Sequence, residues 1–121
     1  MTRNQTVEIN HLTVLQIQYL TELEQLEKGR GIIGAVAAKC GVKHPTVSRF
    51  FKSCIEKGYL TESLEFTDKG KKMLRWHQKV QKDVREYLER SGITEGIDDV
   101  LKGMIENIDY RRLEELTKSH M

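Results

Sequence analysis

The chain has 121 residues, 38% of them hydrophobic, which suffices for one domain or for a small domain with an appended helical region. No apolar run approaches the roughly 18 residues of a membrane span, and no signal peptide opens the chain, so we expect a cytoplasmic protein without a membrane partner. The net charge of +2 hides a segregation: residues 28–82 carry 13 Lys or Arg against four Asp or Glu, whereas 1–27 and 83–121 are acidic. A basic centre of this kind is typical of contact with nucleic-acid phosphates.

The first elements expected are an arm and an amphipathic helix. Residues 1–11 show no periodicity and are expected to form a loose arm. Thr13 and Gln16 match the S/T-x-x-E/Q pattern of a capping box, which predicts the start of a helix. The segment 28–31 ends this helix, and residues 32–33 are expected to form a short edge strand. The apolar stripe of the helix, recognised by its helical spacing, consists of Leu12, Leu15, Tyr19, Leu20, Leu23 and Leu26.

The segment 33–51, IGAVAAKCGVKHPTVSRFF, has the spacing of a helix-turn-helix. Gly41 can take the positive φ of a tight turn, and Pro45 lacks the N–H that the first turn of a helix leaves unpaired. We therefore predict one helix over 34–40 and a second over about 44–57. The apolar positions at which two short crossing helices must touch are Val36, Cys40, Val42, Val47 and Phe50.

A small wing is predicted after the second helix of this motif. Two brief alternating runs, 59–61 and 64–66, bracket Glu62-Ser63 and predict a short β-hairpin. The hairpin carries two glutamates and no basic residue, so deep contact of its tip with a minor groove is not expected. The predicted fold is thus mostly α with a small β-hairpin wing: a winged helix-turn-helix over residues 12–72, followed by a helical dimerisation region over 73–121.

The dimerisation region is inferred from amphipathic helices that have no evident domain of their own to fill. Thr67 is expected to cap a long helix over about 68–90, which Ser91-Gly92 ends. A further helix shows apolar residues at helical spacing, and the chain closes with a short helical tail. Two such helices from each of two subunits would form a small four-helix core, which predicts a homodimer. The apolar positions of the last two helices are Ile97, Val100, Leu101, Met104, Ile105, Ile108, Leu113 and Leu116.

The second helix of the motif is the predicted DNA-reading element. Val47, Phe50, Phe51 and Cys54 are expected to pack inward, which leaves Arg49 on the outer face as the candidate for a bidentate contact to guanine. Hydroxyl groups can bond bases or phosphates, and the lysines are better placed for the backbone. The predicted DNA-binding residues are Lys43, His44, Pro45, Thr46, Ser48, Arg49, Lys52, Ser53, Lys69, Lys71 and Lys72.

With these elements placed, the chain resembles the diphtheria toxin repressor and manganese transport regulator family of winged-helix metalloregulators. The resemblance covers about Leu12 to Leu113. It rests on LTVLQIQYLTEL, VKHPTVSRFF, EKGYL, FTDKGKKM and RWH, in that order and spacing. It implies a homodimeric DNA-binding regulator, most often a repressor, acting on an inverted repeat.

The resemblance also implies where metal ligands would stand. Two ligand types are matched, by His77 in the long helix and Glu106 in the following one. One imidazole and one carboxylate do not make a tight site for a transition metal, which needs several converging ligands. The sequence therefore predicts that the response to Mn(II) or Fe(II) is lost or weakened and that no cofactor is required. The remaining ligand positions of the family are occupied by Gln18, Thr21, Gly103 and Asn107.

Two other functions stay open at this point. A regulator of the multiple-antibiotic-resistance type would also bind DNA, although such proteins normally have a longer, basic wing. A winged-helix protein-interaction module would instead present the basic centre to an acidic partner. An enzyme is not expected, because the chain lacks a phosphate-binding glycine loop, an HExxH motif and a nucleophile with an identifiable base. Cys40 and Cys54 form no CxxC pair and are expected to be reduced core residues.

Overall fold

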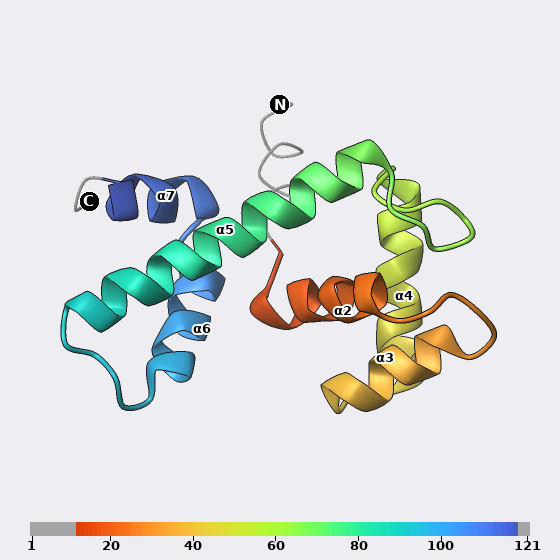
Figure 1. Ribbon diagram of the computed structural model, residues 1–121, viewed down its shortest axis with the longest axis horizontal. Coiled ribbons are helices and arrows are strands. Elements are labelled where there is room, and N and C mark those ends of the chain that lie inside the picture. Colours follow the sequence, from red (N-terminus) through yellow and green to blue (C-terminus); the bar gives the residue numbers. More distant parts are fainter. Residues whose placement is uncertain (1–11, 119–121) are drawn as a thin grey trace. The chain divides into compact units, whose positions relative to one another are not determined.

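A computed structural model describes residues 12–118 of the chain as helices joined by short loops (Figure 1). The described residues divide into two compact units, one formed by residues 15–75 and one by 12–14 and 76–118. The division falls within α5, three residues after the predicted boundary at 72/73, and the predicted arm 1–11 lies outside the described residues. The helices are α2 (Val14–Gln25), α3 (Ile32–Cys40), α4 (His44–Glu56), α5 (Asp68–Arg90), α6 (Ile97–Asn107) and α7 (Tyr110–Lys118).

The start of α3 corrects the predicted edge strand. Ile32 and Ile33 form the first turn of this helix, which begins after Gly31 with φ 83°. Ile32 is buried there, and the Ala35 N–H donates to the Gly31 carbonyl at 2.9 Å. Two β-branched residues favour a strand locally, but burial of Ile32 in the helical unit overrides that preference.

The predicted helix-turn-helix is present as α3 and α4, which pack against each other. Gly41 takes φ 69° at the turn, and the following N–H of Val42 donates to the Ala37 carbonyl at 3.0 Å. Pro45 occupies the first turn of α4, as predicted. Phe50 is only half-buried, with its ring edge-on to Tyr19 at 5.8 Å between centroids. The buried side chains of these two helices are Ile32, Val36, Ala37, Val47, Phe51 and Cys54.

The predicted β-hairpin wing is wrong, because no strand forms between α4 and α5. A single antiparallel bridge joins Leu60 and Phe66. The chain on one side is held to α4, since the Tyr59 N–H donates to the Cys54 carbonyl at 2.9 Å. The residues that follow form a turn, in which Thr61 Oγ1 accepts the Glu65 N–H at 3.1 Å. Eight residues between Gly58 and Thr67 therefore leave room for one bridge and not for a ladder.

The long helix α5 has the predicted bounds and the predicted cap. Thr67 Oγ1 accepts the Gly70 N–H at 3.0 Å and donates to the Gly58 carbonyl at 2.6 Å. The cap therefore fixes the first turn of α5 against the segment that leaves α4. Gly70 lies so close to Tyr59 that a Cβ atom built on it would be 2.0 Å from the Tyr59 carbonyl oxygen.

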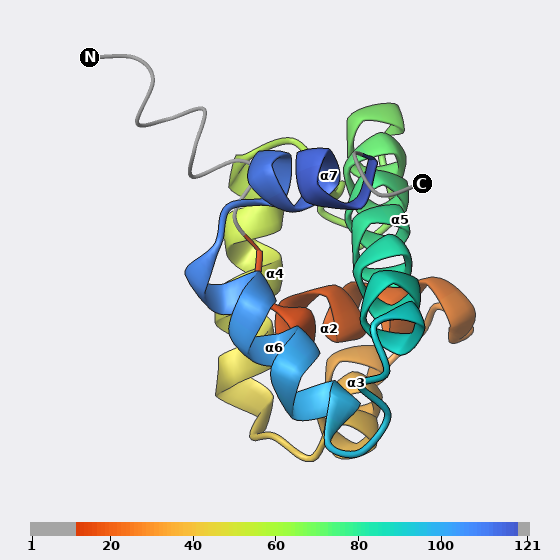
Figure 2. The same ribbon diagram turned by 90° about the vertical axis from the view of Figure 1, so that its left-hand side faces the viewer.

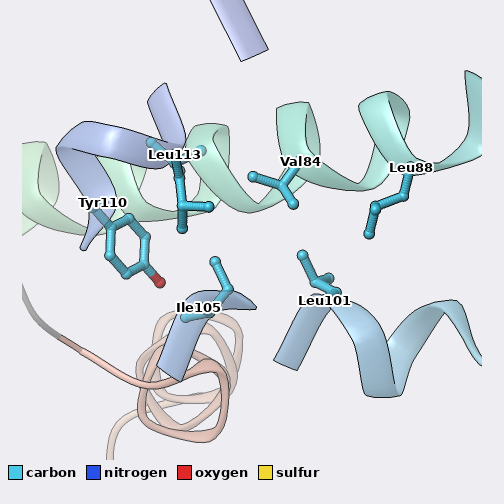
Figure 3. Packing of buried hydrophobic residues seen from close by; sticks show 7 residues of the cluster. Val84, Leu88, Leu101, Ile105, Tyr110 and Leu113 are labelled. Carbon is cyan, nitrogen blue, oxygen red and sulfur yellow. The ribbon is translucent and has the colours of Figure 1, made fainter. Parts of the chain in front are cut away.

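The helices of the C-terminal unit have their own hydrophobic core (Figure 3). Leu101 and Ile105 of α6 face Val84 and Leu88 of α5, and Leu113 of α7 lies beside them. Figure 2 shows α6 and α7 as separate helices alongside α5. The apolar stripes from which the sequence predicts an intersubunit seam are thus covered within one chain, and among the described large hydrophobic side chains Val100, at 37%, is exposed. Periodicity alone does not say which helix covers a stripe, so the homodimer stays a prediction that these stripes do not support.

Tyr110 of this core should make the protein less stable in alkali. Burial raises its pKa to about 12 from 10.0, against the smaller opposing effect of the Gln81 amide that donates to its hydroxyl at 3.0 Å. The folded state therefore keeps the proton while the unfolded chain loses it, so this stabilisation is complete below pH 10 and is lost as pH rises toward 12. We expect the free energy of unfolding to fall by about 1 kcal/mol more between pH 8 and 11 in the wild type than in Tyr110→Phe. Urea denaturation at both pH values measures this. An equal fall in the free energy of unfolding of the two proteins between pH 8 and 11 would contradict it.

Candidate nucleic-acid interface

The outer face of α4 carries the predicted base-reading residues. Thr46, Arg49 and Lys52 are exposed, whereas Ser48 and Ser53 are half-buried. The same helix is anchored from its other side by Val47, which has no exposed surface. The residues that open the helix, Lys43, His44 and Pro45, are exposed as well. The first two turns of α4 therefore present one polar and basic surface to solvent.

The charges on this surface are not neutralised by neighbours within the described residues. There, Lys43, Arg49 and Lys52 form no ion pair, whereas other bases do: Arg75 Nη2 lies 2.5 Å from Glu24 Oε2. Residues 28–55 hold six Lys or Arg and no Asp or Glu, and of these six bases Lys39 pairs with an acid outside the run, Glu22, at 4.0 Å. Bases without acidic neighbours keep their full attraction for an external polyanion.

The three predicted lysines of α5 lie at the other end of α4. Lys69 Nζ donates to the Lys57 carbonyl at 2.9 Å and lies 5.2 Å from the centroid of the Tyr59 ring. Lys69 therefore holds the C-terminal end of α4, while Lys71 and Lys72 beside it are exposed. A helix of 13 residues is about 20 Å long, so these lysines lie roughly that far from the first turn of α4.

Comparison with protein families places this arrangement in a known class. Residues 20–94, more than half of the chain, match the model of a family described as wHTH-PRTase associated. The chain belongs to the wHTH-PRTase associated family. Comparison with curated proteins and with solved structures found no match. In this wHTH-PRTase associated domain, therefore, the winged-helix class predicted from the sequence is confirmed, whereas the narrower resemblance to the diphtheria toxin repressor family gains no support.

The two residues that the sequence predicts as metal ligands lie in different surroundings. His77 is fully buried, its ring 4.3 Å from that of Tyr110 between centroids, and Glu106 is exposed on α6. Within residues 12–118 of this wHTH-PRTase associated protein, no group of three or more His, Cys, Asp or Glu is placed to hold a metal ion. A response to Mn(II) or Fe(II) stays a prediction from the resemblance.

A groove of about 490 Å³ lies in the described part of the C-terminal unit. Its charged lining is balanced, with Arg111 and Lys118 against Glu114 and Glu115, and the Trp76 indole N–H donates to Glu114 Oε2 at 3.3 Å. The groove therefore gives no preference for an anion. No helix in the described part of the chain is both long and apolar enough to cross a membrane.

Two further exposed basic residues of this wHTH-PRTase associated domain lie outside the predicted DNA-binding set. Lys28 and Arg30 lie in the loop between α2 and α3 and are exposed. They belong to the same acid-free run, residues 28–55, as the basic residues of α4. The absence of Asp and Glu from this run is the sequence signal that groups them with the basic residues of α4.

Proposed function

We propose that the chain binds double-stranded DNA in a sequence-selective manner through α4 and acts as a transcriptional regulator. The observation that carries this proposal is the exposed outer face of α4, where Thr46, Arg49 and Lys52 stand in a run without acidic residues. Helix-turn-helix proteins place the N-terminal part of the second helix against base edges in the major groove. The winged-helix class of the family is consistent with this role.

Arg49 is the proposed base-reading residue. Its position in the second turn of α4 and its exposure allow the guanidinium to reach beyond the helix. A planar guanidinium can donate two parallel hydrogen bonds to O6 and N7 of guanine. Thr46, one turn earlier on the same face, would contact a neighbouring base or phosphate, and Lys43 and Lys52 would contact phosphates.

A selection from a random duplex library tests this function. The purified protein is incubated with the library at about 150 mM salt, and the retained sequences are determined. We expect one motif to be enriched, and we expect Arg49→Ala to bind it about 5- to 150-fold more weakly, which corresponds to roughly 1–3 kcal/mol of discrimination. Arg111→Ala, which removes an exposed arginine from α7, is the matched control and should bind like the wild type.

The same selection also tests the homodimer, the repressor role and any metal response. A homodimer on an inverted repeat would enrich two copies with their centres about one helical turn apart, or a multiple of it. A single copy would contradict the homodimer, and promoter repression by the bound protein would distinguish a repressor from an activator. Repeating the selection with Mn(II) or Fe(II) measures any metal response. If no sequence is enriched above the input under any of these conditions, the regulator function is wrong.

The alternative is a protein-interaction module in which the basic face of α4 binds an acidic protein. The winged-helix class of the family is consistent with this alternative as well, because winged-helix domains bind DNA or proteins. Under this alternative, DNA binding would be independent of sequence and would disappear as salt rises. Arg49→Ala would then weaken binding to every duplex equally.

A further inference from the structure

The loop that joins α2 to α3 (Figure 1) carries two basic residues, which alternate with two glycines. Lys28 and Arg30 are exposed, and within the described residues neither forms an ion pair. The two glycines that alternate with them, Gly29 and Gly31, have no atom within 4 Å of the place that a Cβ would take. An external group can therefore approach the main chain as well as the two side chains.

This loop leads to the start of α4. A Cβ atom on Gly34, the third residue of α3, would lie 3.9 Å from Cδ2 of His44. The N-terminal end of α3 therefore lies beside the N-terminal end of α4, although the two are ten residues apart in the chain. Gly31 precedes Gly34 by three residues, which is about one helical turn or 5 Å. The last glycine of the loop therefore lies about one helical turn from the residue of α3 that contacts the first turn of α4.

We infer that the segment Lys28–Gly31 binds the phosphate backbone of the same DNA duplex whose bases α4 reads. The inference rests on the proposed function and adds a second, sequence-independent contact to it. Charge complementarity selects the partner: a duplex carries phosphates at regular close spacing along both strands, and Lys and Arg gain affinity by releasing the counterions condensed there. Contacts of this kind fix the position of a protein on DNA without reading its sequence.

The double variant Lys28→Ala/Arg30→Ala tests the inference. Its affinity is measured for a labelled duplex of random sequence and for the duplex that the library selection enriches. Loss of two phosphate contacts should lower the affinity for both about 30-fold at 0.15 M salt and make the slope of log K against log salt shallower by about 1.8. The ratio of the affinity for the enriched duplex to the affinity for the random duplex should stay unchanged, whereas Arg49→Ala should lower this ratio.

The matched control is Lys102→Ala/Arg111→Ala, which also removes one lysine and one arginine from exposed positions, here on α6 and α7. Gly29→Glu supplies a second variant, because it adds an acid to the loop at a position with open space. It should also lower the affinity of the protein for both duplexes. Circular dichroism confirms that each variant is folded.

The outcomes distinguish the phosphate contact of the loop from the proposed DNA-binding function of α4. If the wild type binds both duplexes and the loop variant keeps its affinity and salt slope, the inference is wrong and the proposed function stands. The inference is also wrong if the control weakens binding as much as the loop variant, since net charge would then be the cause. If the wild type binds neither duplex, both are overturned.

Discussion

Replacing Gly70 by alanine should destabilise the N-terminal unit by about 3 kcal/mol or more. A Cβ atom at this position would lie 2.0 Å from the carbonyl oxygen of Tyr59 and 2.8 Å from its carbonyl carbon. Both partners are backbone atoms, so no change of rotamer relieves the overlap. The backbone cannot easily move either, because the Thr67 N–H donates to the same Tyr59 carbonyl at 3.1 Å and the Thr67 side chain caps the helix.

The expected sign is the opposite of what helix propensity predicts. In an exposed helix interior, alanine is more favourable than glycine by about 1 kcal/mol. Gly103 of α6 is the control, because no atom lies within 4 Å of the place that its Cβ would take. Gly103→Ala should therefore leave stability unchanged or raise it by up to about 1 kcal/mol.

Urea denaturation followed by far-ultraviolet circular dichroism measures both variants. Because stability in urea falls by about 1–3 kcal/mol per M for small proteins, a loss of this size should lower the urea midpoint of Gly70→Ala by about 1–3 M. A Gly70→Ala protein at least as stable as the wild type would show that α5 does not approach Tyr59 this closely.

Replacing Ile105 by alanine should destabilise the C-terminal unit by about 2–5 kcal/mol. Ile105 of α6 has no exposed surface and belongs to the core cluster that residues of α5 and α7 complete (Figure 3). Truncation removes three carbon atoms that the neighbouring side chains cannot fully replace. Trp76, the single tryptophan of the chain, packs against this cluster, with its ring 5.4 Å from that of Tyr110 between centroids, so its fluorescence reports the unfolding of this unit.

Val100→Ala on the same helix is the matched control. Its side chain is 37% exposed, and we expect its loss to change the free energy of unfolding by about 0.5 kcal/mol or less. Because the core is built within one chain, the midpoint of both variants should not change with protein concentration. Equal stability of the two variants, or a midpoint that rises with concentration, would contradict the intrachain core.

Local residue chemistry determined the bounds of the main helices. Pro45, Gly41 and Thr67 each act through their own backbone or a neighbour's, so the limits of α4 and α5 follow from nearby residues. Helical periodicity likewise placed Val47 and Phe51 inside and Arg49 outside, because residues four apart lie on the same face of a helix and a residue two positions on lies on the other side.

Tertiary contacts decided the rest. Whether Ile32 joins a strand or a helix depends on what buries it, and a short apolar run fits both. Whether a β-hairpin forms between α4 and α5 depended on how many residues remain for strands. The turn at Thr61 and the contact of Tyr59 with α4 leave too few. The role of Lys69 depended on where the chain turns back to α4.

The largest difference concerns the helices of the C-terminal unit. Their sequence established by itself that α6 and α7 each bury one face, since apolar residues recur at helical spacing. It did not establish which surface covers that face, because the same stripe packs equally well on another helix of its own chain or on a second copy. Only the tertiary structure, in which Leu101 and Ile105 meet Val84 of the same chain, decided between them, because packing depends on where each helix lies and not on its spacing.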